Sequence, residues 1–201
     1  MKRTSSSKLR QYRDLLYWRL TSRGNTPPPL FKQRLVKSYA RRFGLDVLVE
    51  TGTFHGDMLD ACRGEFRKLY SIEVNKRLYL SARERFARCP QITLVPGDSA
   101  LVLPVVLKAV DGPALFWLDA HAMQGMSDRS LPVTPIVDEL NQVLDSGIGK
   151  YVVLIDDARL FTGGAAYPSL AEVEGLVRSR SPGCVFAVED DVVRIHADSK
   201  P

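Results

Sequence analysis

Cysteines and long apolar segments are scarce in this sequence. The three cysteines, Cys62, Cys89 and Cys184, are odd in number and far apart, which fits neither a disulfide framework nor a zinc knuckle. We therefore expect reduced thiols, as in a cytoplasmic protein. No apolar run approaches the roughly 20 residues that cross a bilayer, and none follows the basic N-terminus, so we expect neither a membrane span nor a secretory signal.

Acidic residues are almost missing from the first 42 positions. That segment holds 12 of the 28 Lys and Arg residues but only one of the 23 acids, Asp14, whereas the rest of the chain carries more acids than bases. A basic leader on an acidic body can approach phosphate or another anionic surface, so nucleic acid is a candidate partner through residues 1–42. A solubilising or partly disordered arm would carry the same charge.

The leader also has helical features. Leu9, Leu16 and Leu20 recur at helical spacing and predict an amphipathic helix over residues 8–21. Three consecutive prolines at 27–29 must end it, and a second helix is expected over 30–42. We assign residues 1–44 to a basic helical extension that caps one main domain, residues 45–201. With 201 residues, 45% of them hydrophobic, the chain can form one such domain with a sizeable core.

From residue 45 short apolar runs alternate with stretches of helical length. Apolar strands separated by helical crossovers indicate a parallel sheet that is covered on both faces. The last two runs are joined by a link of hairpin length. The sequence therefore predicts an α/β fold, a three-layer Rossmann-like sandwich whose mostly parallel seven-stranded sheet closes with a C-terminal antiparallel hairpin. The expected strands are 46–51, 69–73, 91–95, 114–118, 151–155, 184–188 and 192–195, and the expected helices are 56–67, 75–87, 99–109 and 134–146.

Acidic residues follow the first three expected strands, and ligands of such sheets bind beyond the carboxyl ends of the strands. Glu50 is followed by a loop with Gly52 and Gly56, which permit a tight turn and a close approach of a ligand. Glu73 lies 21 residues after Gly52, where a carboxylate can accept both hydroxyls of a ribose. Asp98 is placed to accept from an adenine amino group. Ordinary turns and helix N-caps are the structural alternatives at all three places.

This ordered set resembles the class I S-adenosylmethionine-dependent methyltransferases over roughly residues 45–196. The resemblance implies that Glu50 and Gly52 line the methionine moiety and that Glu73 holds the ribose. It also implies that Asp98 and Ser99 contact adenine. The glycine loop departs from the family's pattern at its usual third small residue, which is a phenylalanine here. S-adenosyl-L-methionine is the expected cofactor, and its expected contacts are Glu50, Gly52, Thr53, Phe54, Gly56, Glu73, Asp98, Ser99 and Asp119.

Three aspartates follow the fourth and fifth expected strands. Asp119 ends one strand, and Asp156 and Asp157 end the other, which the methyltransferase topology makes its neighbour. Ionised carboxylates in one small site raise one another's pKa, and a divalent cation would relieve that conflict. Oxygen ligands favour Mg²⁺, Ca²⁺ or Mn²⁺ over zinc. We therefore predict a metal site on Asp119, Asp156 and Asp157, with Mg²⁺ as the candidate cofactor. In the alternative, Asp156 or Asp157 caps the next turn and pairs with Arg159.

The aspartate pattern resembles the macrocin O-methyltransferases and, more distantly, catechol O-methyltransferase. The segments LDAH, IDDARLF and YPSL also resemble a bacterial group of methyltransferase-like proteins without a settled substrate. We expect Asp119 and His121 to be catalytic, because a histidine with an unperturbed pKa near 6.5 suits a general base. The long loop 122–133 is typical of a lid or a specificity element.

The sequence thus predicts an S-adenosylmethionine-dependent O-methyltransferase, assisted by a divalent metal, that acts on a small hydroxylated metabolite. The expected location is the cytoplasm, and an oligomer is compatible with the sequence. Two alternatives stay open at this point. One is an RNA or protein methyltransferase that uses the basic leader, and the other is a non-catalytic module that binds S-adenosylmethionine for regulation or assembly.

Overall fold

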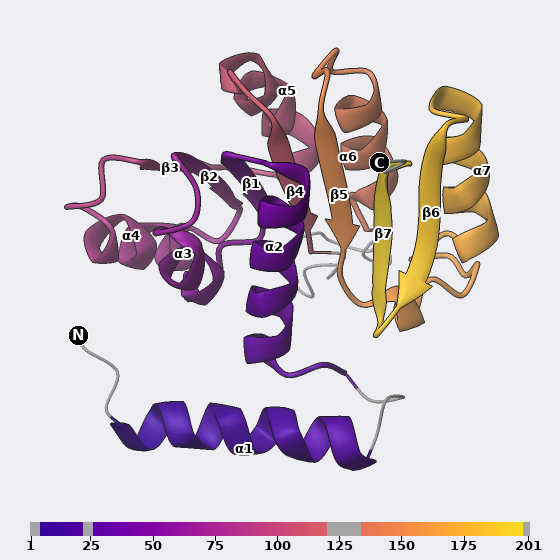
Figure 1. Ribbon diagram of the computed structural model, residues 1–201. Helices are drawn as coiled ribbons and strands as arrows, with labels where there is room; N and C mark the ends of the chain where they lie inside the picture. The colour runs from indigo at the N-terminus through magenta and orange to yellow at the C-terminus, as the bar shows by residue number, and fades with distance from the viewer. Residues whose placement is uncertain (1–4, 22–25, 120–133, 199–201) are drawn as a thin grey trace.

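The computed structural model describes residues 5–21, 26–119 and 134–198. A seven-stranded sheet forms the middle layer, and helices cover both of its faces (Figure 1). The strands are β1 (Val47–Thr51), β2 (Lys68–Glu73), β3 (Ile92–Pro96), β4 (Ala114–Leu118), β5 (Tyr151–Ile155), β6 (Cys184–Glu189) and β7 (Val192–Ala197). The helices are α1 (Ser5–Thr21), α2 (Pro29–Phe43), α3 (Asp57–Cys62), α4 (Lys76–Arg85), α5 (Ser99–Ala109), α6 (Ile136–Leu144) and α7 (Leu170–Arg180), with a short 3₁₀ turn η1 (Ala158–Leu160).

The sheet topology confirms the predicted α/β fold. The strand order is β3-β2-β1-β4-β5-β7-β6. Strands β1 to β5 pair in parallel, and β7 pairs antiparallel with both β5 and β6. The strand bounds differ from the predicted ones by no more than two residues, because each apolar run is flanked by turn-forming or polar residues.

Three helices are shorter than predicted: α4 and α6 each lose one or two residues at both ends, and α3 loses the most. A helix was expected over 56–67, but α3 ends at Cys62. A turn follows, in which the backbone N–H of Glu65 donates to the carbonyl of Cys62 at 2.8 Å. Gly64 lies in this turn, and glycine disfavours continuation of a helix because it loses more backbone entropy inside a helix than other residues do. The chain then enters β2 at Lys68.

Alternate residues of each central strand pack against different helices. In β4, Phe116 and Leu118 belong to the apolar cluster that includes α5, α6 and α7. Leu115 and Trp117 belong to the cluster on the other face, which includes α2, α3 and α4. Because both faces are apolar and covered, polar side chains of the central strands can reach water only at the strand ends. This confines the chemistry to the edges of the sheet.

The N-terminal extension contributes to this core. Helix α2 buries Val36, Tyr39 and Ala40 in the same cluster as β4 and β5. Helix α1 packs on α2, where the ring centroids of Trp18 and Phe31 lie 4.7 Å apart. The boundary between extension and domain at residue 44 stays a prediction, although α2 covers the sheet as the later helices do. Among the described helices, none combines the length and the hydropathy that a membrane span requires.

Two leucines of α5 provide a test of this packing. Leu103 is fully buried, whereas Leu101, on the same helix, is 76% exposed. We expect Leu103→Ala to lower the free energy of unfolding by about 2–5 kcal/mol, because it leaves a cavity between α5 and the sheet. Leu101→Ala should change it by no more than about 0.5 kcal/mol. Urea unfolding followed by circular dichroism measures both, and equal effects would contradict the assigned burial.

Candidate active site

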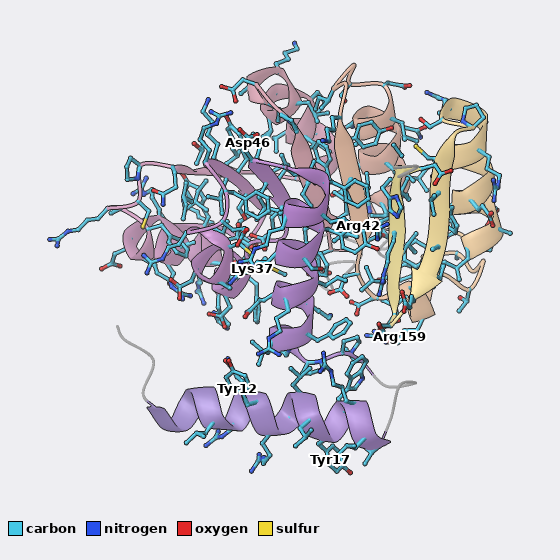
Figure 2. All side chains as sticks on the ribbon, viewed as in Figure 1. Tyr12, Tyr17, Lys37, Arg42, Asp46 and Arg159 are labelled. Atoms are coloured by element: carbon cyan, nitrogen blue, oxygen red, sulfur yellow. The ribbon has the colours of Figure 1, made fainter. Side chains whose placement is uncertain are left out.

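The candidate site lies at the carboxyl edge of the parallel strands. Figure 2 shows Asp46, which precedes β1, and Arg159, which follows β5, at opposite ends of the sheet. In the pairing register Thr51 stands between Ile72 and Leu118, and Leu118 is next to Ile155. The residues that follow these four strands are therefore neighbours. The predicted acids from β1, β2, β4 and β5 meet at this edge.

Glu50 is one of the deeply buried acids of this edge. It is 2% exposed, and Ser71 Oγ donates to its Oε2 at 2.7 Å. Thr53 Oγ1 in turn lies 2.6 Å from Ser71 Oγ. Burial raises the pKa of Glu50 to about 8, opposed by the Ser71 hydrogen bond and reinforced by the nearby charges of Asp119 and Glu73. Glu50 is therefore a neutral acid at neutral pH unless a cationic group approaches it.

The glycine loop, residues 52–56, brings the backbone close to the other strand ends. Gly52 has φ +88°, and a Cβ there would lie 3.3 Å from the Cβ of Asp119. Gly56 has φ +74°, and its Cβ would lie 2.5 Å from Phe86 Cε2. Side chains at these two positions would be strained and crowded. The chain needs both glycines to make this turn.

Phe54 shows how the loop accommodates a bulky residue. Its φ of 49° lies in the left-handed region, and its side chain is 62% exposed, so the ring leaves the loop interior free. Its backbone N–H donates to Glu73 Oε2 at 2.8 Å. The departure from the family's small residue therefore does not block this turn.

Glu73 is held by the backbone on both sides. Besides the Phe54 N–H, the backbone N–H of Asn75 donates to its Oε1 at 2.8 Å. Each carboxylate oxygen keeps a second lone pair for another donor. Asn75 itself is the N-cap of α4, since its Oδ1 accepts from the N–H groups of Arg77 and Leu78. The structure thus fixes the orientation of Glu73 beside the glycine loop.

Asp98 and Ser99 follow β3, one strand further out. Asp98 is exposed and forms the N-cap of α5, with Oδ1 accepting from the backbone N–H of Ala100 at 2.9 Å. Ser99 is the first residue of the helix. The capping alternative for Asp98 is therefore realised, and its second oxygen stays available. A contact with adenine is still a prediction for both residues.

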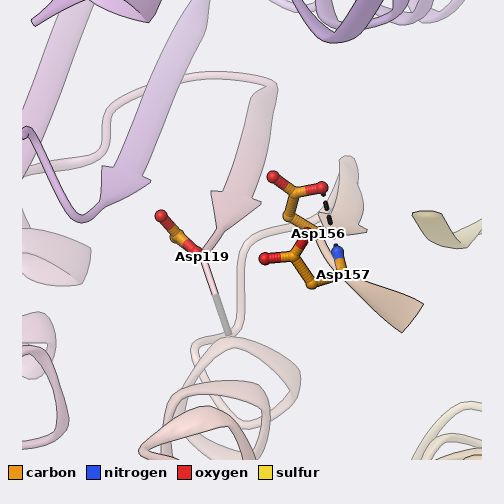
Figure 3. A group of neighbouring side chains, drawn as sticks. All are labelled: Asp119, Asp156 and Asp157. Atoms are coloured by element: carbon orange, nitrogen blue, oxygen red, sulfur yellow. Dashed lines mark hydrogen bonds between the residues drawn. The ribbon is translucent and has the colours of Figure 1, made fainter. Parts of the chain in front are cut away.

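The three predicted metal ligands do come together. One carboxylate oxygen from each of Asp119, Asp156 and Asp157 can be chosen so that all lie within 4.8 Å of one another. Figure 3 shows Asp119 at the end of β4 facing the pair that follows β5. The backbone N–H of Asp157 donates to Asp156 Oδ1 at 2.9 Å, and Asp157 has φ 58°. We call these three residues the carboxylate cluster.

Two basic side chains contact the carboxylate cluster. Lys32 Nζ, from α2, lies 2.5 Å from Asp156 Oδ2 and 3.6 Å from Asp157 Oδ1. Arg159 Nη1 lies 2.7 Å from Asp157 Oδ1 and also pairs with Asp191. The alternative in which an aspartate pairs with Arg159 is therefore present for Asp157. The pairing of Asp157 with Arg159 does not exclude metal binding, because the three carboxylates offer six oxygens.

The pKa of Asp156 reflects these opposing influences. Burial raises it to about 6, Lys32 opposes the rise, and the charges of Asp157 and Asp119 add to it. The Lys32 ammonium thus compensates the charge of the carboxylate cluster only in part. A further cation at the cluster would be electrostatically favourable.

Two residues of the site were missed by the sequence analysis. Lys32 is one of them. The sequence places it four residues before Val36, and therefore on the face of α2 that is buried. Glu139 is the other, fully buried on α6, where Thr51 Oγ1 donates to its Oε2 at 3.4 Å. Burial raises the pKa of Glu139 to about 7, and hydrogen bonds from Ser99 and Thr51 oppose the rise. Its signal was a charged residue next to Leu140 on an otherwise apolar helix face.

Thr51 connects this buried acid to the carboxylate cluster. The backbone N–H of Asp119 donates to Thr51 Oγ1 at 3.2 Å, so Thr51 fixes the backbone of Asp119 at the end of β4. His121 and the loop 122–133 lie outside the described residues. The catalytic role that we expect for His121 therefore stays a prediction.

The raised pKa of Glu50 leads to a pH-dependent stability. The folded protein keeps this proton to about pH 8, whereas the unfolded chain loses it near the ordinary value of 4.5. Between these values the folded state binds more protons, so the free energy of unfolding falls as pH rises. For one group the fall is at most about 1.4 kcal/mol per pH unit. We expect Glu50→Gln to reduce this slope.

Urea unfolding of the ligand-free protein at pH 5.5, 6.5 and 8 measures the effect. Glu84→Gln on the exposed face of α4 is the control and should keep the slope of the parent protein. Parallel curves for the parent protein and Glu50→Gln would contradict a protonated Glu50.

The site can now be compared with known proteins. A scan against protein-family models finds no match, and a search of curated proteins finds none either. Solved structures do match the fold. The O-methyltransferase TomG from Streptomyces achromogenes, involved in tomaymycin synthesis and crystallised with S-adenosylmethionine, superposes with a TM-score of 0.62 at 16% identity, covering 93% of this chain and 88% of its own.

Two further structures show the same similarity. An O-methyltransferase from Bacillus cereus, in complex with S-adenosylhomocysteine, has a TM-score of 0.59 at 11% identity, with 98% of this chain and 93% of that chain covered. The methyltransferase PaMTH1 from Podospora anserina, also bound to S-adenosylhomocysteine, has a TM-score of 0.58 at 14% identity, with 99% and 97% covered. At such identities the similarity is one of architecture. The chain has the fold of the class I S-adenosylmethionine-dependent methyltransferases.

Proposed function

We propose that this protein transfers a methyl group from S-adenosylmethionine to a hydroxyl of a small molecule, with the help of a divalent cation. The observation that carries the proposal is the placement of the acids. Glu50 and Glu73 flank the glycine loop at the ends of β1 and β2, and the carboxylate cluster lies beside them at the ends of β4 and β5. A cofactor site and an acceptor site would thus be adjacent.

The residues at β1 and β2 fit the methyl donor. Gly52 removes the Cβ that would crowd Asp119, so a ligand can approach the loop backbone. Glu73 is oriented by two backbone N–H groups and offers free lone pairs to a ribose diol. Glu50 would face the cationic end of the donor. S-adenosylmethionine supplies an activated methyl group on a sulfonium, so the chain needs mainly to orient the acceptor behind it.

The carboxylate cluster fits a divalent cation by its donor set. Asp119, Asp156 and Asp157 offer only oxygen ligands within a small volume, as Mg²⁺ and Mn²⁺ prefer. Such a cation would supply Lewis acidity that lowers the pKa of an acceptor hydroxyl. The aspartates would orient that hydroxyl next to the donor site. His121 is our candidate for accepting its proton.

The structural neighbours support the chemistry without assigning a substrate. TomG and the Bacillus cereus protein are both described as O-methyltransferases, and all three neighbours were crystallised with S-adenosylmethionine or its demethylated product. Transfer of their activity to this chain is part of our proposal. A cytoplasmic location is part of it as well.

The cofactor part is tested first. Glu73→Gln keeps the shape of the side chain but loses its charge and one acceptor position, so we expect S-adenosylhomocysteine to bind about 10-fold or more weakly. Glu84→Gln should bind as the parent protein does. Isothermal titration calorimetry measures both. No binding by the parent protein at millimolar ligand would reject the proposed function.

The metal part has a separate test. Asp156→Asn should lower methyl transfer to a panel of sugars, catechols and other hydroxylated compounds by about 100-fold or more, because one cluster ligand loses its charge. Its affinity for S-adenosylhomocysteine should stay within about 3-fold of the parent value, since Asp156 follows β5, two strands away from β1 and its glycine loop. Asp138→Asn, exposed on α6, is the control. Full activity of Asp156→Asn would remove the metal from the mechanism.

A nucleic acid acceptor is the second candidate function. Arg10, Arg13 and Arg19 are exposed on α1, and Figure 1 places α1 beyond the edge at which β5 ends. Such a helix could track a phosphate backbone, and binding would then weaken steeply with salt. Salt-sensitive RNA binding that disappears when all three arginines become glutamine would favour this function over a small-molecule acceptor.

A further inference from the structure

Lys32 is placed unusually for a residue of a basic leader. It lies in the first turn of α2, and its side chain is only 15% exposed. Its ammonium contacts two carboxylates that are themselves buried, Asp156 at 2.5 Å and Asp157 at 3.6 Å, with side chains 7% and 1% exposed. The contact joins residues 124 positions apart in the chain. Charges with this little solvent around them interact much more strongly than surface pairs do.

The ammonium competes for an oxygen that a metal would use. Asp156 Oδ1 already accepts from the backbone N–H of Asp157 at 2.9 Å, whereas Oδ2 is the oxygen that contacts Lys32. Because Oδ1 is engaged by the backbone, a divalent cation shared with Asp119 and Asp157 would take Oδ2 of Asp156. A cation and an ammonium on the same oxygen would repel each other in a poorly solvated place.

We infer that Lys32 is the resident counter-cation of the carboxylate cluster and that a divalent cation must displace it from Asp156 in order to bind. This inference rests on the metal part of the proposed function and not on the methyl donor. It makes α2 a determinant of metal affinity, although α2 lies outside the part of the chain that carries the cluster.

The two basic side chains at the cluster differ in how easily they can leave. Arg159 is held by both Asp157 and Asp191. Lys32 contacts only acids of the cluster among the pairs of the described residues, and its flexible four-carbon side chain can swing to solvent. Helix α2 itself stays anchored, because Val36, Tyr39 and Ala40 are buried in the core. Displacement therefore needs a rotamer change and no movement of the helix.

Lys32→Met tests the inference, and Lys37→Met is the matched control. The control removes the same charge from the same helix. The charge of Lys37 influences Cys62 and Glu65, whereas Lys32 is the lysine that influences Asp156. Figure 2 places Lys37 on α2 at a distance from Arg159.

Mn²⁺ binding is measured by electron paramagnetic resonance of the free ion and by calorimetry, without any methyl donor or acceptor. We expect Lys32→Met to bind Mn²⁺ at least 10-fold more tightly than the parent protein, and Lys37→Met to match the parent.

Thermal unfolding gives a second readout. In EDTA the Lys32→Met protein should melt below the parent, because buried carboxylates lose their counter-charge. Mn²⁺ should restore its Tm by a larger increment than it adds to the parent protein. If Lys32 only stabilised the fold, Lys32→Met would lower the Tm in EDTA, but Mn²⁺ would not raise the Tm of the variant more than that of the parent protein.

The outcomes separate this inference from the proposed function. Equal or weaker Mn²⁺ affinity of a folded Lys32→Met protein overturns the inference, as does the absence of Mn²⁺ binding in both proteins. Calorimetry with S-adenosylhomocysteine on the same samples tests the donor site independently. Tighter Mn²⁺ binding without any S-adenosylhomocysteine binding would uphold the role of Lys32 while rejecting the methyltransferase.

Discussion

Five acids are buried at one edge of a parallel sheet, and the chain has to stabilise each of them away from bulk water. They are Glu50, Glu73, Glu139, Asp156 and Asp157. An ionised carboxylate in such a place is costly unless it is protonated, hydrogen-bonded or paired. This protein uses all three solutions within a few residues of one another. Glu50 keeps its proton, Glu73 accepts from two backbone N–H groups, and Asp156 and Asp157 face Lys32 and Arg159. Such a concentration of uncompensated or partly compensated charge is typical of a binding site.

The sheet dictates where these acids can lie. Its inner strands pack against apolar helices on both faces, so a charged side chain in mid-strand would be surrounded by apolar groups. The strand ends are different, because loops and helix N-termini there offer backbone N–H groups. The N–H groups of Phe54 and Asn75 orient Glu73, and Thr51 Oγ1 accepts from the N–H of Asp119. Local backbone geometry thus sets the direction in which each acid points before any ligand arrives.

Strand positions and the acids behind them could be predicted because both signals are local. An apolar run followed by Glu, Asp or Gly indicates a strand and the place where it ends. This pattern predicted the positions of Glu50, Glu73 and the carboxylate cluster at the strand ends. The partners of these acids could not be predicted in the same way, because the pair of Lys32 with Asp156 depends on how α2 crosses the sheet. Glu139 was missed for a related reason. Its neighbours Ile136 and Leu140 made the helix face look purely apolar, although a charge on that face must reach a polar partner.

The uneven charge of the chain gains a structural explanation from these contacts. Part of the basic leader is compensated within the fold, since Lys32 pairs with Asp156 and Arg41 pairs with Glu65. The leader is therefore part of the fold, because one of its cations reaches the acids at the sheet edge. In our inference, a cation that binds Asp156 competes with Lys32 of α2 for the same oxygen. The affinity of the site for cations is consequently set by the first helix on the sheet as much as by the strands that carry the aspartates.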